Sequence, residues 1–140
     1  MDNSCDSALE SVCRGFLSAF QEALSWKWDD RFGTALAEFR ADDEDKVRAI
    51  LEDHLSVAWT SSNIGEAPDS VRMINSHLGG LMSGQMLLTS DPNKDAFMFC
   101  AWWPWNDGKT VSIRVGPSYK EVSASEKSER IKRFKDCFGF

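Results

Sequence analysis

The sequence has 140 residues, enough for one domain with its own hydrophobic core, and its 42% hydrophobic and 11% aromatic content is typical of a globular chain. Sixteen Lys and Arg against 22 Asp and Glu give a net charge of −6, which disfavours binding to nucleic-acid phosphates. No run approaches the ~18 apolar residues of a membrane span, and the N-terminal segment lacks the basic and apolar regions of a secretory signal. We therefore expect a single cytoplasmic domain over residues 1–140, with neither membrane nor nucleic acid among its partners.

The beginning of the chain predicts two helices. Apolar residues recur at a spacing of three and four from Leu9 to Leu24, which is the pattern of an amphipathic helix. Asp29 or Asp30 can then cap a short second helix, because a carboxylate accepts hydrogen bonds from the first free N–H groups of a helix. The apolar stripe of this second helix consists of Phe32, Leu36 and Phe39.

The segment from Ala41 to Trp59 predicts a third helix with an acidic beginning. Asp42 to Asp45 carry four negative charges where the helix dipole favours them, and nine acidic against four basic residues lie between Asp29 and Asp53. A solvated, capped helix face explains these charges, and the alternative is an acidic docking surface. Residues from Val57 to Thr60 fit a short strand about as well as a helix end.

The second half of the chain predicts one helix, a β-meander and a final helix. Ser70 can cap the first of these helices, which ends at Gly79-Gly80. The spacing of apolar residues then changes toward two, and the expected strands are Gln85–Thr89, Ala96–Trp103 and Thr110–Val115. Gly116-Pro117 is expected to end the third strand, and Ser123 or Ser125 to cap the last helix. This order of elements predicts an α+β fold with helices mainly on one face of a three- to four-stranded antiparallel sheet.

The hairpin from Ala96 to Val115 is the part of the chain around which we expect the fold to be organised. Its first strand is apolar at every position, so both faces should be covered, whereas its second strand alternates. Trp102 and Trp103 are neighbours, so their rings must point to opposite faces, and Trp105 lies in the hairpin loop. A wide core, a homodimer interface or a binding surface would each explain the second ring.

The sequence contains no catalytic signature. His54 and His77 lie in predicted helices at or beside apolar positions, where histidines are more often hydrogen-bonded core residues than catalytic bases. Cys100 lies between apolar strand residues, which predicts a buried, unreactive thiol. Because the sequence has no secretory signal, we expect the four cysteines, Cys5, Cys13, Cys100 and Cys137, to be free thiols. No Cys-x-x-Cys pair occurs, so we assign them no metal and no cofactor.

These features favour a small acidic protein-binding module, of the inhibitor, immunity or chaperone kind, that acts on a basic protein partner. The candidate partner-binding residues come from the Trp-rich hairpin and the acidic helix: Trp102, Trp103, Trp105, Asp107, Asp42 and Asp43. The alternative is a small-molecule-binding or enzymatic domain with a pocket between sheet and helices. His77, Cys100 and Trp103 would then be the residues of interest.

Overall fold

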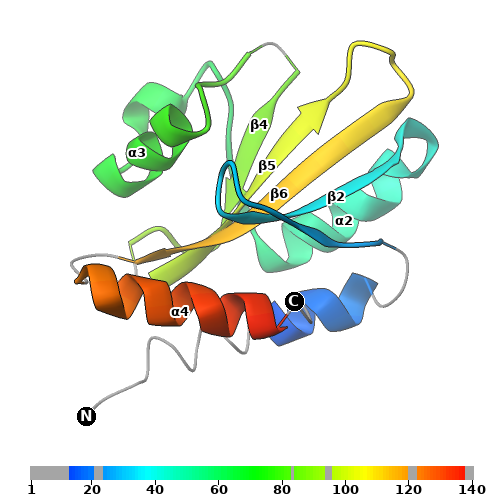
Figure 1. The fold of residues 1–140 in the computed structure, drawn as a ribbon. Coiled ribbons are helices and arrows are strands. Elements are labelled where there is room, and N and C mark those ends of the chain that lie inside the picture. The colour runs from blue at the N-terminus through cyan, green and yellow to red at the C-terminus, as the bar shows by residue number, and fades with distance from the viewer. Residues whose placement is uncertain (1–12, 21–23, 83, 94–95, 120–122, 138–140) are drawn as a thin grey trace.

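The computed structural model describes residues 13–20, 24–82, 84–93, 96–119 and 123–137. They form an α+β fold built on a six-stranded antiparallel sheet in the order β1-β2-β6-β5-β4-β3 (Figure 1). The strands are β1 (Lys27–Asp29), β2 (Thr34–Arg40), β3 (Val57–Trp59), β4 (Met86–Thr89), β5 (Ala96–Pro104) and β6 (Thr110–Tyr119). Residues 13–20 are helical, and the other helices are η1 (Ala41–Asp43), α2 (Glu44–His54), η2 (Ile64–Glu66), α3 (Asp69–His77) and α4 (Ala124–Cys137).

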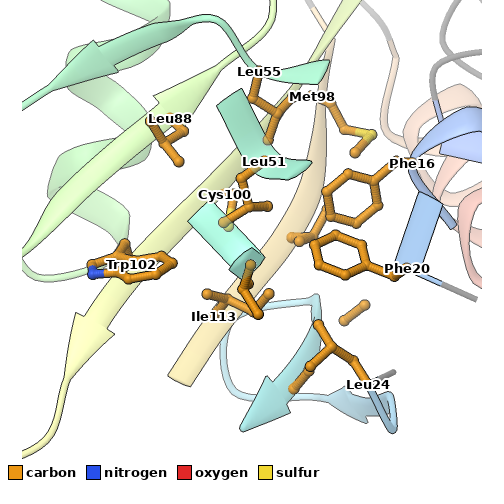
Figure 2. Close-up of a cluster of buried hydrophobic side chains, with 14 of the residues drawn as sticks. Phe16, Phe20, Leu24, Leu51, Leu55, Leu88, Met98, Cys100, Trp102 and Ile113 are labelled. Atoms are coloured by element: carbon orange, nitrogen blue, oxygen red, sulfur yellow. The ribbon is translucent and has the colours of Figure 1, made fainter. Parts of the chain in front are cut away.

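The first face of the sheet carries the larger core and most of the helices. Alternate residues of β5 and β6, such as Met98, Cys100 and Ile113, point to this face. They pack against the 13–20 helix, α2 and α4, and Figure 2 shows Phe16 and Phe20 close to these strand side chains. This arrangement confirms the expected α+β fold with its helices mainly on one side.

The second face of the sheet is only partly covered. Val71 and Leu78, from α3 and its end, pack on a smaller cluster that includes Phe97, Phe99 and Leu87 of the central strands. The covered area lies over β4 and β5, and the rest of this face carries polar residues of β1, β2 and β6. Both faces of β5 are therefore buried, as its uninterrupted apolar sequence predicts.

The prediction of a second helix around Phe32–Phe39 was wrong, because this segment forms the β1–β2 hairpin. Inside β2, Ala35, Ala37 and Phe39 point to the first face, which is the alternation of a half-buried strand. Gly33 takes a positive φ of 65° in the connecting turn, and its N–H donates to the Asp29 carbonyl. Together with β3, this hairpin widens the sheet from the expected three or four strands to six.

The third strand of the meander is longer than predicted. β6 runs past Gly116 and Pro117 to Tyr119, whereas β2 pairs with it only as far as Val115. Beyond that point β6 has β5 as its partner on one side, so a proline without an N–H is tolerated there. The expected short strand at Val57–Thr60 is present as β3.

Two helix ends lie at the capping serine and glycines that the sequence indicates. Ser123 caps α4 as predicted, because its Oγ accepts the Glu126 N–H at 3.2 Å and donates to the Glu126 carboxylate at 3.1 Å. Gly79 and Gly80 end α3 with φ values of 94° and 89°. Ser70, however, lies in the first turn of α3 after Pro68 and is not its cap.

Candidate functional site

The two adjacent tryptophans of β5 have different roles. Trp102 points to the first face, is 4% exposed and packs on Phe39 at a ring distance of 5.5 Å. Trp103 points to the second face and is half-buried there. Of the predicted partner-binding residues, Trp102 is thus a core residue, and Trp103 lies on the second face of the sheet.

The loop between β5 and β6 is shaped by one carboxylate. Asp107 accepts hydrogen bonds from the N–H groups of Lys109 and Thr110 at 2.8 and 3.0 Å, and from the Thr110 hydroxyl at 3.1 Å. These bonds, the Lys109 N–H first, hold the pKa of Asp107 below its ordinary value. Gly108 completes the turn with a φ of 68°. Trp105 stands at the start of this loop and is 46% exposed.

The acidic start of the third predicted helix lies beside this loop. Ala41, the first residue of η1, donates its N–H to the Lys109 carbonyl at 2.7 Å. Asp42 and Asp43 follow in η1, and both side chains are exposed. The Ala41–Lys109 hydrogen bond joins η1, which carries Asp42 and Asp43, to the loop that carries Trp105 and Asp107, and we call these four residues the acidic tip.

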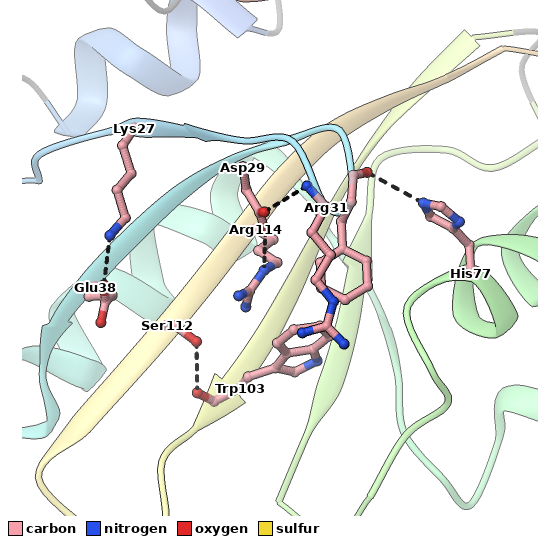
Figure 3. Close-up of polar contacts among 9 residues, drawn as sticks. Lys27, Asp29, Arg31, Glu38, His77, Trp103, Ser112 and Arg114 are labelled. Atoms are coloured by element: carbon pink, nitrogen blue, oxygen red, sulfur yellow. Dashed lines mark hydrogen bonds and ion pairs between the residues drawn. The ribbon is translucent and has the colours of Figure 1, made fainter.

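A concave site of about 260 Å³ lies on the second face, at the edge of the area that α3 covers. One wall is the Trp103 indole, which stacks on the Arg114 guanidinium at 4.3 Å and meets the Phe32 ring at 5.6 Å (Figure 3). The opposite wall is the Leu78–Gly80 segment after α3. We call this site the arginine pocket because Arg31 and Arg114 both line it.

Arg114 of β6 lies on the second face and is held there by an ion pair with Asp29. Its Nε donates to Asp29 Oδ2 at 2.8 Å, and the two side chains are 17% and 14% exposed. The other carboxylate oxygen of Asp29 accepts the Arg31 N–H at 3.1 Å. Asp29 therefore joins the β1–β2 turn to β6, a role different from the helix cap predicted for it.

Two of the three residues named for a small-molecule or enzyme pocket, His77 and Trp103, pack on the same Phe32 ring, whereas Cys100 lies on the opposite face of the sheet. Cys100 is fully buried on the first face, where burial raises the pKa of its thiol well above the ordinary value. His77 is exposed on the second-face side, with its Nε2 3.4 Å from the Phe32 carbonyl oxygen, so the expectation of a core histidine was wrong for this residue. His54 is part-buried, with Nδ1 3.1 Å from the Ile50 carbonyl oxygen, as expected for a core histidine. Cys5 lies outside the described residues.

Sequence reasoning missed Arg31, Phe32 and Arg114. The sequence pattern puts Phe32 on the stripe of a helix, and the alternation of Thr110–Val115 puts Arg114 only on the polar face of a strand. A usable signal was the pairing of β5 and β6, since the meander register places Arg114 opposite Ala101 and diagonal to Trp103. The contribution of the β1–β2 turn could not be found without recognising that hairpin.

Within the described ranges, no three His, Cys, Asp or Glu side chains are grouped as metal ligands would be, and no helix is both long and apolar enough to cross a bilayer. No protein-family model matches this chain, and no curated protein and no solved structure matches it either.

Proposed function

We propose that the protein is a binding module of the cytoplasm whose acidic tip recognises a basic surface of another protein. The observation that supports this proposal is the contact between η1 and the β5–β6 loop. The Ala41–Lys109 hydrogen bond joins η1, where Asp42 and Asp43 are exposed, to the loop in which Trp105 is 46% exposed. An aromatic anchor next to a charged rim is the usual composition of a protein-binding surface.

The two kinds of residue would act at different stages of binding. Asp42 and Asp43 attract a positively charged partner over a distance set by the salt concentration, so they raise the association rate. Trp105 then buries its ring and slows dissociation, because a large rigid side chain loses little entropy on binding. Asp107 holds the loop in shape through three hydrogen bonds, so its carboxylate is a positioning group.

A heterologous partner fits this surface better than a second copy of the chain. The acidic tip has three carboxylates beside the two exposed cations Arg40 and Lys109, and the whole sequence has a net charge of −6. Two such tips facing each other would repel, since like charges across an interface cost binding energy.

The proposal is tested by identifying proteins that bind the tagged chain and then measuring direct binding with the purified partner. We expect Trp105→Ala to raise the dissociation constant by roughly 30-fold, as for a central aromatic anchor. We expect Asp42→Asn together with Asp43→Asn to slow association and to weaken its dependence on salt. The partner should carry a net positive charge at the contacted surface.

Two matched controls show whether the effects come from the acidic tip. Met73→Ala removes an equally apolar side chain that is 72% exposed on α3. Glu66→Gln with Glu129→Gln removes the same two charges from exposed positions elsewhere. If the controls weaken binding as much as the tip variants do, or if no tip variant weakens it while circular dichroism shows an intact fold, the proposal fails.

A further inference from the structure

The arginine pocket is rich in hydrogen-bond donors that the fold does not use. Among the described residues, Asp29 accepts a hydrogen bond from only the Nε atom of the Arg114 guanidinium, and Arg114 lines the pocket, so we assign its two Nη groups to a ligand. Gln85 also lines the pocket, and its amide oxygen accepts the Met82 N–H at 3.0 Å. Its NH₂ end is therefore the part that a ligand can use.

The guanidinium of Arg114 is held ready for a ligand. Its plane is fixed from three sides, by the Asp29 carboxylate at 2.8 Å, the Trp103 ring at 4.3 Å and the Phe32 ring at 5.3 Å. A side chain fixed in this way loses little further freedom when a ligand binds, so more of the interaction appears as affinity. Figure 3 shows Arg114, Arg31 and Trp103 grouped between the β1–β2 turn and β5.

Arg31 supplies a second positive charge at the rim. Its side chain is exposed and its guanidinium carbon lies 5.0 Å from the centre of the Phe32 ring. The Arg31 and Arg114 charges and the Asp29 carboxylate leave one net positive charge at the pocket. This local charge has the opposite sign to that of the whole chain, so it is not a consequence of the overall composition.

We infer that the arginine pocket binds a small organic carboxylate. The carboxylate accepts hydrogen bonds from Arg31 and from the Nη groups of Arg114, whose planar fork matches a carboxylate. The apolar part of the ligand lies between the Trp103 and Leu78 side chains, which line the same pocket. A monoanion matches the net charge of the site, whereas a phosphate dianion would leave a negative charge uncompensated.

The size of the pocket sets the size of the ligand. Its volume of about 260 Å³ corresponds to about nine water molecules at ~30 Å³ each. Benzoate, with a carboxylate on a single ring, is a probe of suitable size. Gly79 and Gly80 add no side chain to this wall, and a Cβ built at either one would meet no other atom within 4 Å.

This inference does not depend on the proposed protein partner. The arginine pocket shares no residue with the acidic tip, since it is built on the β1–β2 turn, β6, Trp103 and the end of α3. If no carboxylate binds, the proposal for the acidic tip still stands. If the acidic tip binds no protein, the proposal for the arginine pocket still stands.

The test is a titration of the full chain with benzoate, benzamide and phenyl phosphate, followed by calorimetry and by ¹H–¹⁵N NMR of the tryptophan indoles. We expect benzoate to bind with a dissociation constant on the order of 1 mM and to shift the Trp103 indole signal, assigned with Trp103→Phe. Benzamide has the same shape without the charge and should bind at least ~10-fold more weakly. Phenyl phosphate should bind no more tightly than benzoate.

Variants of exposed arginines decide which side chain holds the carboxylate. Arg31→Gln should weaken benzoate binding by about 10-fold, the effect of one charge-assisted hydrogen bond. Arg48→Gln, on an exposed position of α2, is the matched control and should leave binding unchanged. Equal binding of benzoate and benzamide, tighter binding of phenyl phosphate, or an unchanged affinity in Arg31→Gln would each overturn the inference.

Discussion

The stability of the central sheet is expected to depend on the absence of a side chain at Gly116. This residue lies in β6 directly opposite Phe99 of β5. A Cβ at Gly116 would stand 2.7 Å from Phe99 Cζ and 3.2 Å from Thr34 Cγ2. Carbon atoms attract each other best at about 3.5 to 4.0 Å, so Gly116→Ala requires the ring to move by about 1 Å.

The Phe99 ring has little room for such a movement. It is 6% exposed and packs in the second-face cluster, while Thr34 on the other side is completely buried. Overpacking of this kind typically costs about 1 to 3 kcal/mol. For a chain of this size we expect Gly116→Ala to lower the melting temperature by roughly 3 to 10 °C. Urea unfolding followed by circular dichroism gives the free energy directly.

Two further variants test whether the loss comes from this contact. Gly65→Ala is the matched control, because a Cβ there meets nothing within 4 Å and should not destabilise the fold. Phe99→Leu removes the ring edge, so Gly116→Ala should cost less in that background. Full stability of Gly116→Ala, or an equal cost of this change with and without Phe99→Leu, would refute the reasoning.

Three more predictions concern single side chains. Asp29→Ala should lower the free energy of unfolding by about 2 kcal/mol in urea, because Arg114 loses its partner in a place of low exposure; Glu38→Ala, in an exposed ion pair with Lys27, should cost less than about 0.5 kcal/mol. Asp107 should titrate below the ordinary ~3.9 of an aspartate in carboxyl NMR, so its contribution to stability is present above that value and is lost as pH falls through the folded-state pKa. Cys100 should resist a thiol reagent in the native chain and react only on unfolding, since burial raises its pKa; peptide mapping that finds rapid native labelling there would contradict this.

The meander was predictable because its signals were local and strong. The β5 strand is apolar at consecutive positions and β6 alternates, and the loop between them contains Asn106-Asp107-Gly108. Each of these features specifies strands and a turn without help from the rest of the fold. The same is true of α4, for which Ser123 and Glu126 form a capping pair three residues apart.

The β1–β2 hairpin was not predictable because Asp29, the residue that shapes its turn, is equally typical of a helix start. Asp29 accepts the N–H of the residue two positions on, and an aspartate makes similar hydrogen bonds at the start of a helix and in a tight turn. Phe32 and Phe39 happened to match a helical spacing, whereas the true alternation of β2 rests on two small residues, Ala35 and Ala37. Alanine carries little hydrophobic signal, so the strand pattern was weak.

In the candidate sites, too, single residues were predictable from the sequence, whereas the way in which they come together was not. Trp105 and the acidic residues were recognisable by composition, but the link between their segments is the Ala41–Lys109 hydrogen bond, which joins parts far apart in the chain. Besides Trp103 of β5, the arginine pocket joins the β1–β2 turn, β6 and the end of α3, and two of these last three were placed correctly. A site that needs all three elements could not be predicted once one of them was assigned as a helix.

The covering of the sheet explains why Trp103 and not Trp102 became available for binding. Three helical segments on the first face bury Trp102 completely within a large core. On the second face α3 covers only the β4–β5 side. The apolar cluster under α3 therefore has a boundary, which we call the step, with the uncovered polar residues of β2 and β6. Trp103 stands at that step, with Arg114 on its polar side. A step between apolar and charged surface suits a ligand that has both characters, which is the physical reason to look for a carboxylate there.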